Sequence, residues 1–119
     1  MKILAIIPAR MASSRFPGKP LKKINGKEMI KIIYQNVDKN KKLKDTIIAT
    51  CDNEIKLFCI KNNMKYIMTS KKHVRASDRT AEAVIKYEKF NKTKIDLVVM
   101  IQGDEPMVDQ KMIDMSIEP

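Results

Sequence analysis

The amino-acid sequence predicts an α/β domain built on a parallel sheet. Three observations support this prediction: short apolar runs alternate with helical patterns, one run is apolar throughout, and no linker divides the 119 residues. Strands that alternate with helices pair in parallel, because each helix returns the chain to the start of the next strand. We therefore expect one domain with helices on both faces of the sheet.

The first strand and the first helix have the clearest patterns. Ile3–Ile7 is continuously apolar and ends at Pro8, which is typical of a strand buried on both faces. The segment 28–37 repeats apolar residues at helical spacing, which predicts a helix with one buried face. The apolar residues of this helix are Ile30, Ile33 and Val37.

The middle of the chain supplies two further strands and a helix between them. Thr46–Thr50 forms the second strand. Asp52 is expected to cap a helix that extends to about Lys61, since a carboxylate at this position can accept a hydrogen bond from a free amide. Tyr66–Met68 makes a short third strand.

The last predicted elements are a helix, a buried strand and the start of another helix. The pattern predicts a helix from Ser77 to about Lys89, and Ile95–Ile101 is a fourth buried strand. A final helix is expected to begin near Asp109. The side chains that should face inward from the Ser77 helix are Ala81, Val84 and Ile85.

Basic residues outnumber acidic ones, 24 to 14, and the formal net charge is +10. The first 44 residues hold twelve basic and two acidic side chains, so the whole excess lies there. Four of the basic residues are arginines, in two pairs: Arg10 with Arg15, and Arg75 with Arg79. Arginine presents a rigid, permanently charged fork that suits phosphate. These two segments are therefore candidate anion sites, whereas most lysines are expected to be solvated cations.

Composition argues against several classes of protein. No apolar run approaches the roughly 18 residues of a membrane-spanning helix. Cys51 and Cys59, with one histidine, are too few for a disulfide framework or a zinc site. The beginning of the chain imitates a secretory signal, but Pro8 and Arg10 interrupt the apolar run. We expect a cytoplasmic protein.

The connection between the first strand and the first helix is a candidate triphosphate cradle. It runs from Ala9 to Lys27, whereas such connections usually take roughly 2–6 residues, and it leaves the carboxyl end of a strand, where open α/β sheets bind ligands. Gly18 allows close approach of the main chain to a ligand, although neither a Walker A loop nor a GxGxxG fingerprint is present. The alternative is a solvated basic turn stiffened by two prolines. The cations are Arg10, Arg15 and Lys19, and the hydroxyls are Ser13 and Ser14.

The second candidate segment runs from His73 to Arg79, at the start of a predicted helix. Asp78 suits a helix N-terminus, but Arg79 opposes the positive end of the helix dipole, at a cost of roughly a few tenths of a kcal/mol. This placement indicates an anionic or polar partner for Arg79. The alternative is an exposed Arg79 paired with Asp78 or Glu82. We expect His73 to be a loop histidine rather than a base.

The third candidate segment, Gln102–Pro106, closes the fourth strand. Its carboxylates should face the same crevice as the first connection, because the carboxyl ends of parallel strands meet at one edge. Mg²⁺ accompanies triphosphates and prefers one or two carboxylates together with phosphate oxygens and water. Asp104 is therefore the best candidate metal ligand. The alternative is a turn in which Asp104 caps the next helix.

Several stretches together resemble a known family: Ile7-Pro8-Ala9-Arg10, Ser13 to Leu21, Asn25-Gly26-Lys27, Ala49-Thr50, His73 to Arg79 with Ala81-Glu82, and Gln102 to Pro106. They look like the 3-deoxy-manno-octulosonate cytidylyltransferases, or CMP-KDO synthetases, which are sugar nucleotidyltransferases. The resemblance covers essentially the whole chain. The related acylneuraminate cytidylyltransferases typically have paired glycines where this chain has Met11-Ala12, so the octulosonate branch is the better match.

The resemblance implies a Rossmann-like, glycosyltransferase-A-like nucleotidyltransferase fold, truncated here. It also implies a reaction in which CTP and an eight-carbon ulosonic acid give a CMP-sugar and pyrophosphate, for lipopolysaccharide or a related surface glycan. Gln102 would approach the sugar acid and Asp104 would hold Mg²⁺. The implied nucleotide-binding residues are Pro8, Ala9, Arg10, Ser13, Ser14, Arg15, Lys19, Ser77 and Arg79. The implied catalytic residues are Arg10, Lys19 and Asp104.

Two departures from the family pattern affect what the resemblance implies. The usual motif is His-x-x-Gly-Thr-Asp/Glu-Arg, whereas this chain places Arg75-Ala76-Ser77 before Asp78-Arg79, which leaves base and sugar specificity open. Family members are also about twice as long. We therefore expect residues 1–119 to be the N-terminal nucleotide-binding part, and the remainder to supply another metal-binding aspartate, much of the sugar pocket and the contacts of a homodimer. A naturally short variant is the alternative.

Three other functions are alternatives to that of a cytidylyltransferase. A nucleotidyltransferase for another surface sugar differs only in its acceptor. A basic nucleic-acid-binding domain would fit the charge, but aromatic residues make up only 5% of the chain and tryptophan is absent, which leaves little for base stacking. A redox or dinucleotide-binding domain is disfavoured, because the glycine fingerprint and a CxxC pair are missing. We expect neither nucleic acid nor a membrane among the partners.

Overall fold

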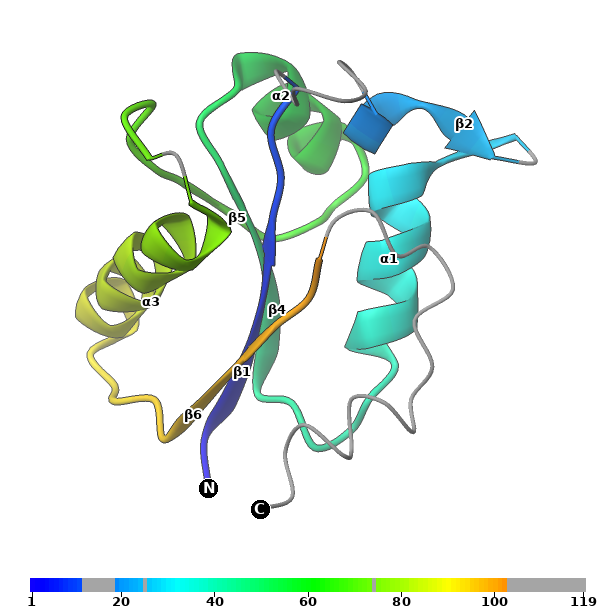
Figure 1. Ribbon diagram of the computed structural model, residues 1–119. Helices are drawn as coiled ribbons and strands as arrows, with labels where there is room; N and C mark the ends of the chain where they lie inside the picture. Colours follow the sequence, from blue (N-terminus) through cyan, green and yellow to red (C-terminus); the bar gives the residue numbers. More distant parts are fainter. Residues whose placement is uncertain (12–18, 25, 74, 103–119) are drawn as a thin grey trace.

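A computed structural model of the protein describes residues 1–11, 19–24, 26–73 and 75–102. Its main sheet has four parallel strands in the order β5-β4-β1-β6 (Figure 1). The predicted parallel α/β architecture is confirmed. The strands are β1 (Ile3–Pro8), β4 (Asp45–Thr50), β5 (Tyr66–Met68) and β6 (Leu97–Met100).

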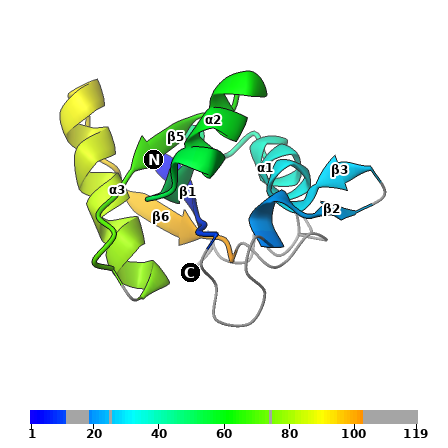
Figure 2. The ribbon, with the colours of Figure 1, turned by 90° about the horizontal axis from the view of Figure 1, so that it is seen from above.

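Helices cover both faces of this sheet, as the sequence predicts. α1 (Met29–Asp38) and α2 (Asn53–Lys61) pack on one face, and α3 (Ala76–Asn91) packs on the other (Figures 1 and 2). The two cores divide β1 by the alternation of its side chains, since successive residues of a strand point to opposite faces. Ala5 and Ile7 belong to the α1 side, whereas Leu4 and Ile6 belong to the α3 side.

The central strand β1 is buried along its whole length, which explains its continuous apolar run. It pairs on both sides, with Ile6 opposite Ile47 of β4 and opposite Met100 of β6. After β1 the chain builds β4 and β5 on one side and then returns to place β6 on the other. The sheet therefore has a topological switch point at β1, and open α/β sheets bind ligands at the carboxyl end of such a point.

Part of the long first connection is regular structure that the sequence analysis did not predict. A 3-10 helix, η1 (Lys19–Leu21), is followed by a small antiparallel hairpin of β2 (Lys23–Ile24) and β3 (Lys27–Glu28). Gly26 lies between the two strands with φ +85°, a conformation that favours glycine. The amide of Met29 donates to the carbonyl of Lys22 at 2.9 Å, so the hairpin is joined to the start of α1.

The predicted inward face of α3 is wrong for two of its three residues. Ala81 is exposed and Ile85 is 64% exposed, while Val84 is half-buried and packs against the core as predicted. The buried side chains are instead Arg79, Thr80, Ala83 and Tyr87. Small Ala83 lets the helix approach the sheet, and the Tyr87 hydroxyl donates to Asp45 at 2.6 Å. In this orientation of the helix, Tyr87 and Arg79 find hydrogen-bond partners in Asp45 and Thr69.

Two smaller expectations concern the cysteines and membrane spans. Cys51 and Cys59 are both free cysteines, Cys51 half-buried and Cys59 buried. Burial raises the pKa of the Cys59 thiol to about 11. Within the described residues, none of the helices has the length and apolar character that crossing a membrane requires.

The orientation of α3 predicts that Ile85 of this helix contributes much less to stability than Ile33 of α1. Ile33→Ala should lower the free energy of unfolding by about 2–5 kcal/mol, because Ile33 is fully buried between α1 and the sheet. Ile85→Ala removes the same atoms from an exposed position and should change it by less than about 0.5 kcal/mol. Chemical denaturation measures both values, and similar losses would contradict the orientation described for α3.

Candidate active site

The end of β1 brings the first predicted site residues to the carboxyl edge of the sheet. Pro8 is the last residue of β1, and Ala9 continues the pairing because its amide donates to the carbonyl of Ala49 at 2.9 Å. Both are buried, whereas Arg10 is half-buried at the point where the chain leaves the sheet. The backbone here is bonded to Ala49 on the β4 side, so it offers a fixed surface beside which a ligand can bind.

Asp52 fixes the start of the first connection. Its carboxylate accepts the amide of Met11 at 2.8 Å, and its own amide donates to the Thr50 hydroxyl at 3.1 Å. Asp52 does stand at the N-cap position of α2, as predicted, but it makes no side-chain cap bond to that helix. The prediction of a capping carboxylate is therefore wrong, because Asp52 instead accepts a hydrogen bond from a segment 41 residues earlier.

The structure does not describe several predicted residues of the candidate triphosphate cradle. Ser13, Ser14 and Arg15 lie outside the described residues. Lys19 begins η1, and only its backbone is described. Their assignment to the nucleotide stays a prediction.

Gln102 reaches the same edge from the other side of β1. The amide of Ile101 donates to the carbonyl of Ile6 at 2.9 Å, which extends the pairing of β6 beyond Met100. Gln102 then follows as an exposed residue about level with Pro8, two positions beyond the paired Ile6 and Met100. The structure thus brings Arg10 and Gln102 to one edge at the switch point. Asp104 lies outside the described residues.

Arg79 is buried and hydrogen-bonded to neutral groups. Only 3% of the residue is exposed. Its Nε donates to the Thr69 hydroxyl at 3.0 Å, and Nη2 lies 3.5 Å from the Ser70 carbonyl and 3.6 Å from the Cys51 sulfur. An exposed arginine paired with Asp78 or Glu82 was the alternative, and the burial excludes it. Within the described ranges, no carboxylate forms an ion pair with Arg79.

The helix start beside Arg79 carries the remaining predicted residue. Ser77 is exposed in the first turn of α3, and Arg75 occupies the N-cap without a side-chain cap bond. Arg75 is exposed as well. The segment therefore presents one buried and one exposed guanidinium near the N-terminus of a 16-residue helix, a terminus that favours anions.

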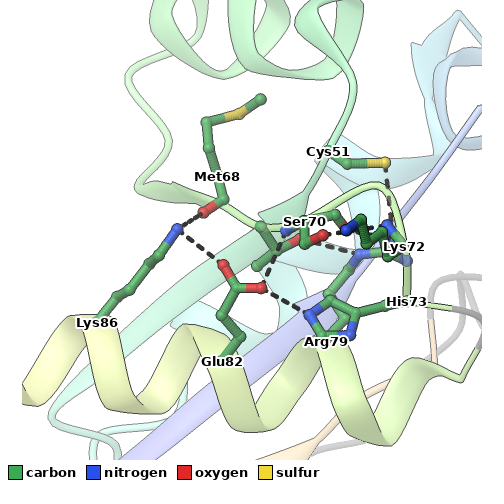
Figure 3. A network of polar contacts seen from close by, with 9 residues as sticks. Cys51, Met68, Ser70, Lys72, His73, Arg79, Glu82 and Lys86 are labelled. Atoms are coloured by element: carbon green, nitrogen blue, oxygen red, sulfur yellow. Dashed lines mark hydrogen bonds and ion pairs between the residues drawn. The ribbon is translucent and has the colours of Figure 1, made fainter.

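A polar cluster that the sequence analysis did not predict lies next to Arg79 (Figure 3). The Glu82 carboxylate accepts the Ser70 amide at 3.0 Å, lies 2.6 Å from His73 Nε2, and pairs with Lys86 at 2.7 Å. These hydrogen bonds, of which that from Lys86 has the largest effect, lower the pKa of Glu82 to about 2. The Glu82–Lys86 spacing of four residues was visible in the sequence as a favourable helical pair. Its contacts with the preceding loop were not.

The sequence predicts Asp104 as the ligand of Mg²⁺. In the described part of the chain no group of three or more His, Cys, Asp or Glu residues could hold a metal ion. A Mg²⁺ ion shared with a triphosphate needs no such group, because phosphate oxygens and water complete its coordination. One or two carboxylates therefore suffice, and the donor set proposed from the sequence is chemically adequate.

A groove of about 890 Å³ lies elsewhere, between β5 and the C-terminal half of α3. Its lining is mostly apolar and includes Tyr66, Met68, Tyr87 and Phe90. None of the predicted site residues lines it. The groove is at the β5 edge of the sheet, whereas the switch point lies between β1 and β6.

Comparisons with known proteins relate the chain to cytidylyltransferases. Residues 4–119 match the cytidylyltransferase family. The 3-deoxy-manno-octulosonate cytidylyltransferases of Cytophaga hutchinsonii and Thermodesulfovibrio yellowstonii are 41% and 39% identical to the chain, over 95% and 99% of its length. These alignments cover 44% and 47% of the two relatives, so the chain spans about half their length.

A solved structure supports the same relationship. A CMP:2-keto-3-deoxy-manno-octonic acid synthetase complexed with CTP superposes with a TM-score of 0.82 at 33% sequence identity. The match covers 97% of this chain and 45% of that one. The agreement extends across the whole sheet and confirms the expected Rossmann-like fold, of which this chain contains about half.

The hydrogen bond from Arg79 makes a stability prediction about two buried threonines. Thr69→Val should lower the free energy of unfolding by about 1.5–3 kcal/mol, because it leaves a buried charged donor without its acceptor. Thr80→Val is the matched control: the Thr80 hydroxyl is buried without a partner among the described residues, so its loss should be neutral or slightly stabilising. Denaturant titrations measure both, and equal effects would contradict the role of Thr69.

Glu82 makes a prediction about the dependence of stability on pH. Its pKa is lowered from 4.5 to about 2, so its ionised form stabilises the fold above about pH 4.5, and this contribution is lost as the pH falls toward 2. Glu82→Gln should remove part of the acid destabilisation, on the order of 2 kcal/mol between these pH values. Lys86→Met should act in the same direction. The free energy of unfolding is measured against pH for both proteins. Parallel curves for the wild type and Glu82→Gln would contradict the pairing of Glu82 with Lys86.

Proposed function

Because this chain belongs to the cytidylyltransferase family, we propose that it forms the nucleotide-binding part of a 3-deoxy-manno-octulosonate cytidylyltransferase. The reaction joins CTP to an eight-carbon ulosonic acid and releases pyrophosphate. Relatives of about 40% identity carry that name, and the solved relative was complexed with CTP. The observation that carries the proposal is the meeting of the Ala9–Arg10 backbone and Gln102 at the carboxyl edge of the switch point.

The proposed mechanism is an in-line displacement at phosphorus. The anomeric hydroxyl of the sugar acid attacks the α-phosphorus of CTP and releases its proton to water, the bond from the α-phosphorus to the bridging oxygen breaks, and pyrophosphate leaves. Arg10 and Lys19 would stabilise the negative charge that develops toward the leaving group. Gln102 would orient the acceptor. Positioning and electrostatics would supply most of the acceleration, without a covalent protein intermediate.

The contacts of Arg79 favour a nucleotide-binding site beside α3. Its guanidinium is held by a hydroxyl, a carbonyl and a thiol, none of which neutralises its charge. Among the described residues Arg79 has no counter-ion; a buried cation in that state is costly, and an anionic ligand would offset that cost. Ser77 at the first turn of α3 would add a hydroxyl and a backbone donor to the same side.

Mg²⁺, the cellular location and the assembly complete the proposal. Asp104 would hold Mg²⁺, which supplies Lewis-acid stabilisation of the phosphate oxygens when bound. The product would serve lipopolysaccharide or a related surface glycan, and we infer a cytoplasmic enzyme that forms a homodimer when it has the length of its relatives. Neither nucleic acid nor a membrane is required by this function.

A nucleotidyltransferase for another acidic surface sugar is the second candidate. Arg75 favours it, because an exposed arginine stands at the start of α3, at a position that the family motif leaves open. An extra cation at this point would suit an additional anionic substituent. Comparing 3-deoxy-manno-octulosonate with other acidic sugars as acceptors separates the two candidates.

The assigned roles predict the behaviour of three lysine and aspartate variants. In the complete gene product, Lys19→Ala and Asp104→Asn should each lower kcat/KM for CTP by about 100-fold or more, because each removes charge stabilisation at the phosphates. Lys23→Ala, an exposed lysine of β2, is the matched control and should change it less than about threefold. Pyrophosphate release measures turnover, and circular dichroism verifies that each variant folds. Normal turnover by a folded Lys19→Ala or Asp104→Asn variant would refute that residue's role.

A further inference from the structure

One carboxylate on α3 holds the connection that leads from β5 into that helix. Glu82 Oε1 accepts the amide of Ser70 at 3.0 Å and lies 2.6 Å from Nε2 of His73 (Figure 3). Its side chain is 24% exposed, so these bonds are partly shielded from water. Two points of the connection are therefore fixed to the second turn of α3.

Lys86, one turn further along α3, adds a third point. Its Nζ donates to the carbonyl of Met68 at 2.8 Å and pairs with Glu82 Oε2 at 2.7 Å. Met68 is the last residue of β5. The backbone at Met68 and Ser70 is thus bonded to two neighbouring side chains of one helix, which leaves Thr69 between two fixed residues.

The fixed connection is also what holds Arg79. The Thr69 hydroxyl accepts Nε of Arg79 at 3.0 Å, and the Ser70 carbonyl accepts Nη2 at 3.5 Å. Because Arg79 is only 3% exposed, these acceptors and the Cys51 sulfur, rather than water, decide the direction of its guanidinium. Glu82 itself forms no ion pair with Arg79 among the described residues. Thr69 and Ser70 are therefore the contacts through which Glu82 can act on Arg79, and the amide of Thr69 also donates to the Thr50 carbonyl of β4 at 2.9 Å.

We propose that Glu82 is a positioning residue for the nucleotide site, acting on Arg79 through the connection that it holds. The proposal rests on the proposed function, in which Arg79 contacts CTP. Glu82 keeps Ser70 and His73 against α3. Together with the Thr50 carbonyl, which accepts the Thr69 amide, they keep Thr69 in place, and Thr69 aims the guanidinium. His73 takes part in this as a hydrogen-bond partner of Glu82, not as a base.

The first test measures the position of Arg79 without any substrate. In the 119-residue chain, Glu82→Ala should speed the exchange of the Arg79 Nε proton with water by about tenfold or more in NMR spectra, because its acceptor is no longer held. Glu88→Ala is the matched control. Glu88 lies on the same helix and also accepts a backbone amide, that of Ile95 at 2.7 Å, but far from Arg79, and its loss should leave this exchange unchanged. Unchanged exchange in Glu82→Ala would overturn the proposal.

The second test measures CTP use by the complete gene product. Glu82→Ala should raise KM for CTP by about tenfold and change kcat less than about threefold, with Glu82→Gln in between, since Gln still accepts the Ser70 amide. A merely structural role would reduce the amount of active enzyme, and hence the apparent kcat, at unchanged KM. Glu88→Ala should leave KM unchanged.

Combining Glu82→Ala with Arg79→Ala separates the positioning role from the proposed function. If Glu82 acts through Arg79, the double variant should have the KM of Arg79→Ala alone. If the two substitutions instead raise KM for CTP by factors that multiply in the double variant, the positioning role of Glu82 is overturned while the nucleotide role of Arg79 stands. If Arg79→Ala leaves KM for CTP unchanged, the nucleotide role of Arg79 fails instead, and the exchange measurement then decides whether Glu82 positions the guanidinium.

Should Glu82→Ala fail to fold, Glu82→Gln carries the same three measurements. It retains the size of the side chain and an oxygen acceptor but loses the charge that pairs with Lys86. It should show a smaller rise both in Arg79 exchange and in KM for CTP. A folded Glu82→Gln variant with wild-type values for both would overturn the proposal.

Discussion

The pairing of β1 on both of its sides is the constraint on which the rest of the structure depends. β1 is buried on both faces and is bonded to β4 and β6, so a shift of one residue would exchange Ala5 and Ile7 with Leu4 and Ile6 between the two cores. The larger isoleucine and leucine side chains could not both be accommodated in the other core at native packing density. The register of β1 therefore also determines which backbone groups stand at its carboxyl edge. Packing of the core thus fixes the geometry of the candidate site at that edge.

Strands and the first helix could be predicted from the sequence, because burial leaves a local signal in each of them. β1, β4 and β5 are apolar runs, and α1 buries Ile30, Ile33 and Val37 as its spacing indicates. The parts that were missed depend on contacts between distant segments. Asp52 looks like a cap when only its neighbours are considered, but its acceptor role is decided by Met11, 41 residues away. The hairpin of β2 and β3 did have a local signal in Asn25-Gly26, a dipeptide typical of two-residue turns.

The face of α3 could not be predicted, for a physical reason. An amphipathic reading places apolar residues inward, yet the buried face of α3 contains an arginine and a threonine. Arg79 can be buried only because Thr69 and Ser70, from the end of β5 and its loop, offer it acceptors. Thr69 and Ser70 lie beside Arg79 because β5 pairs in parallel with β4. This tertiary arrangement cannot be read from any single segment of the sequence. Functional sites are where such disagreements between local pattern and fold are expected.

The separation of Glu82 from Arg79 has an electrostatic consequence. The two residues are three positions apart on one helix, a spacing at which a carboxylate and a guanidinium can pair. Such a pair would neutralise the charge that an anionic nucleotide would need to meet. Instead Glu82 is matched by Lys86 and His73, and Arg79 is matched by uncharged oxygens and a sulfur. The helix thus keeps its anchoring carboxylate and its buried cation in two separate sets of contacts, so that Glu82 holds the loop while no carboxylate among the described residues neutralises Arg79.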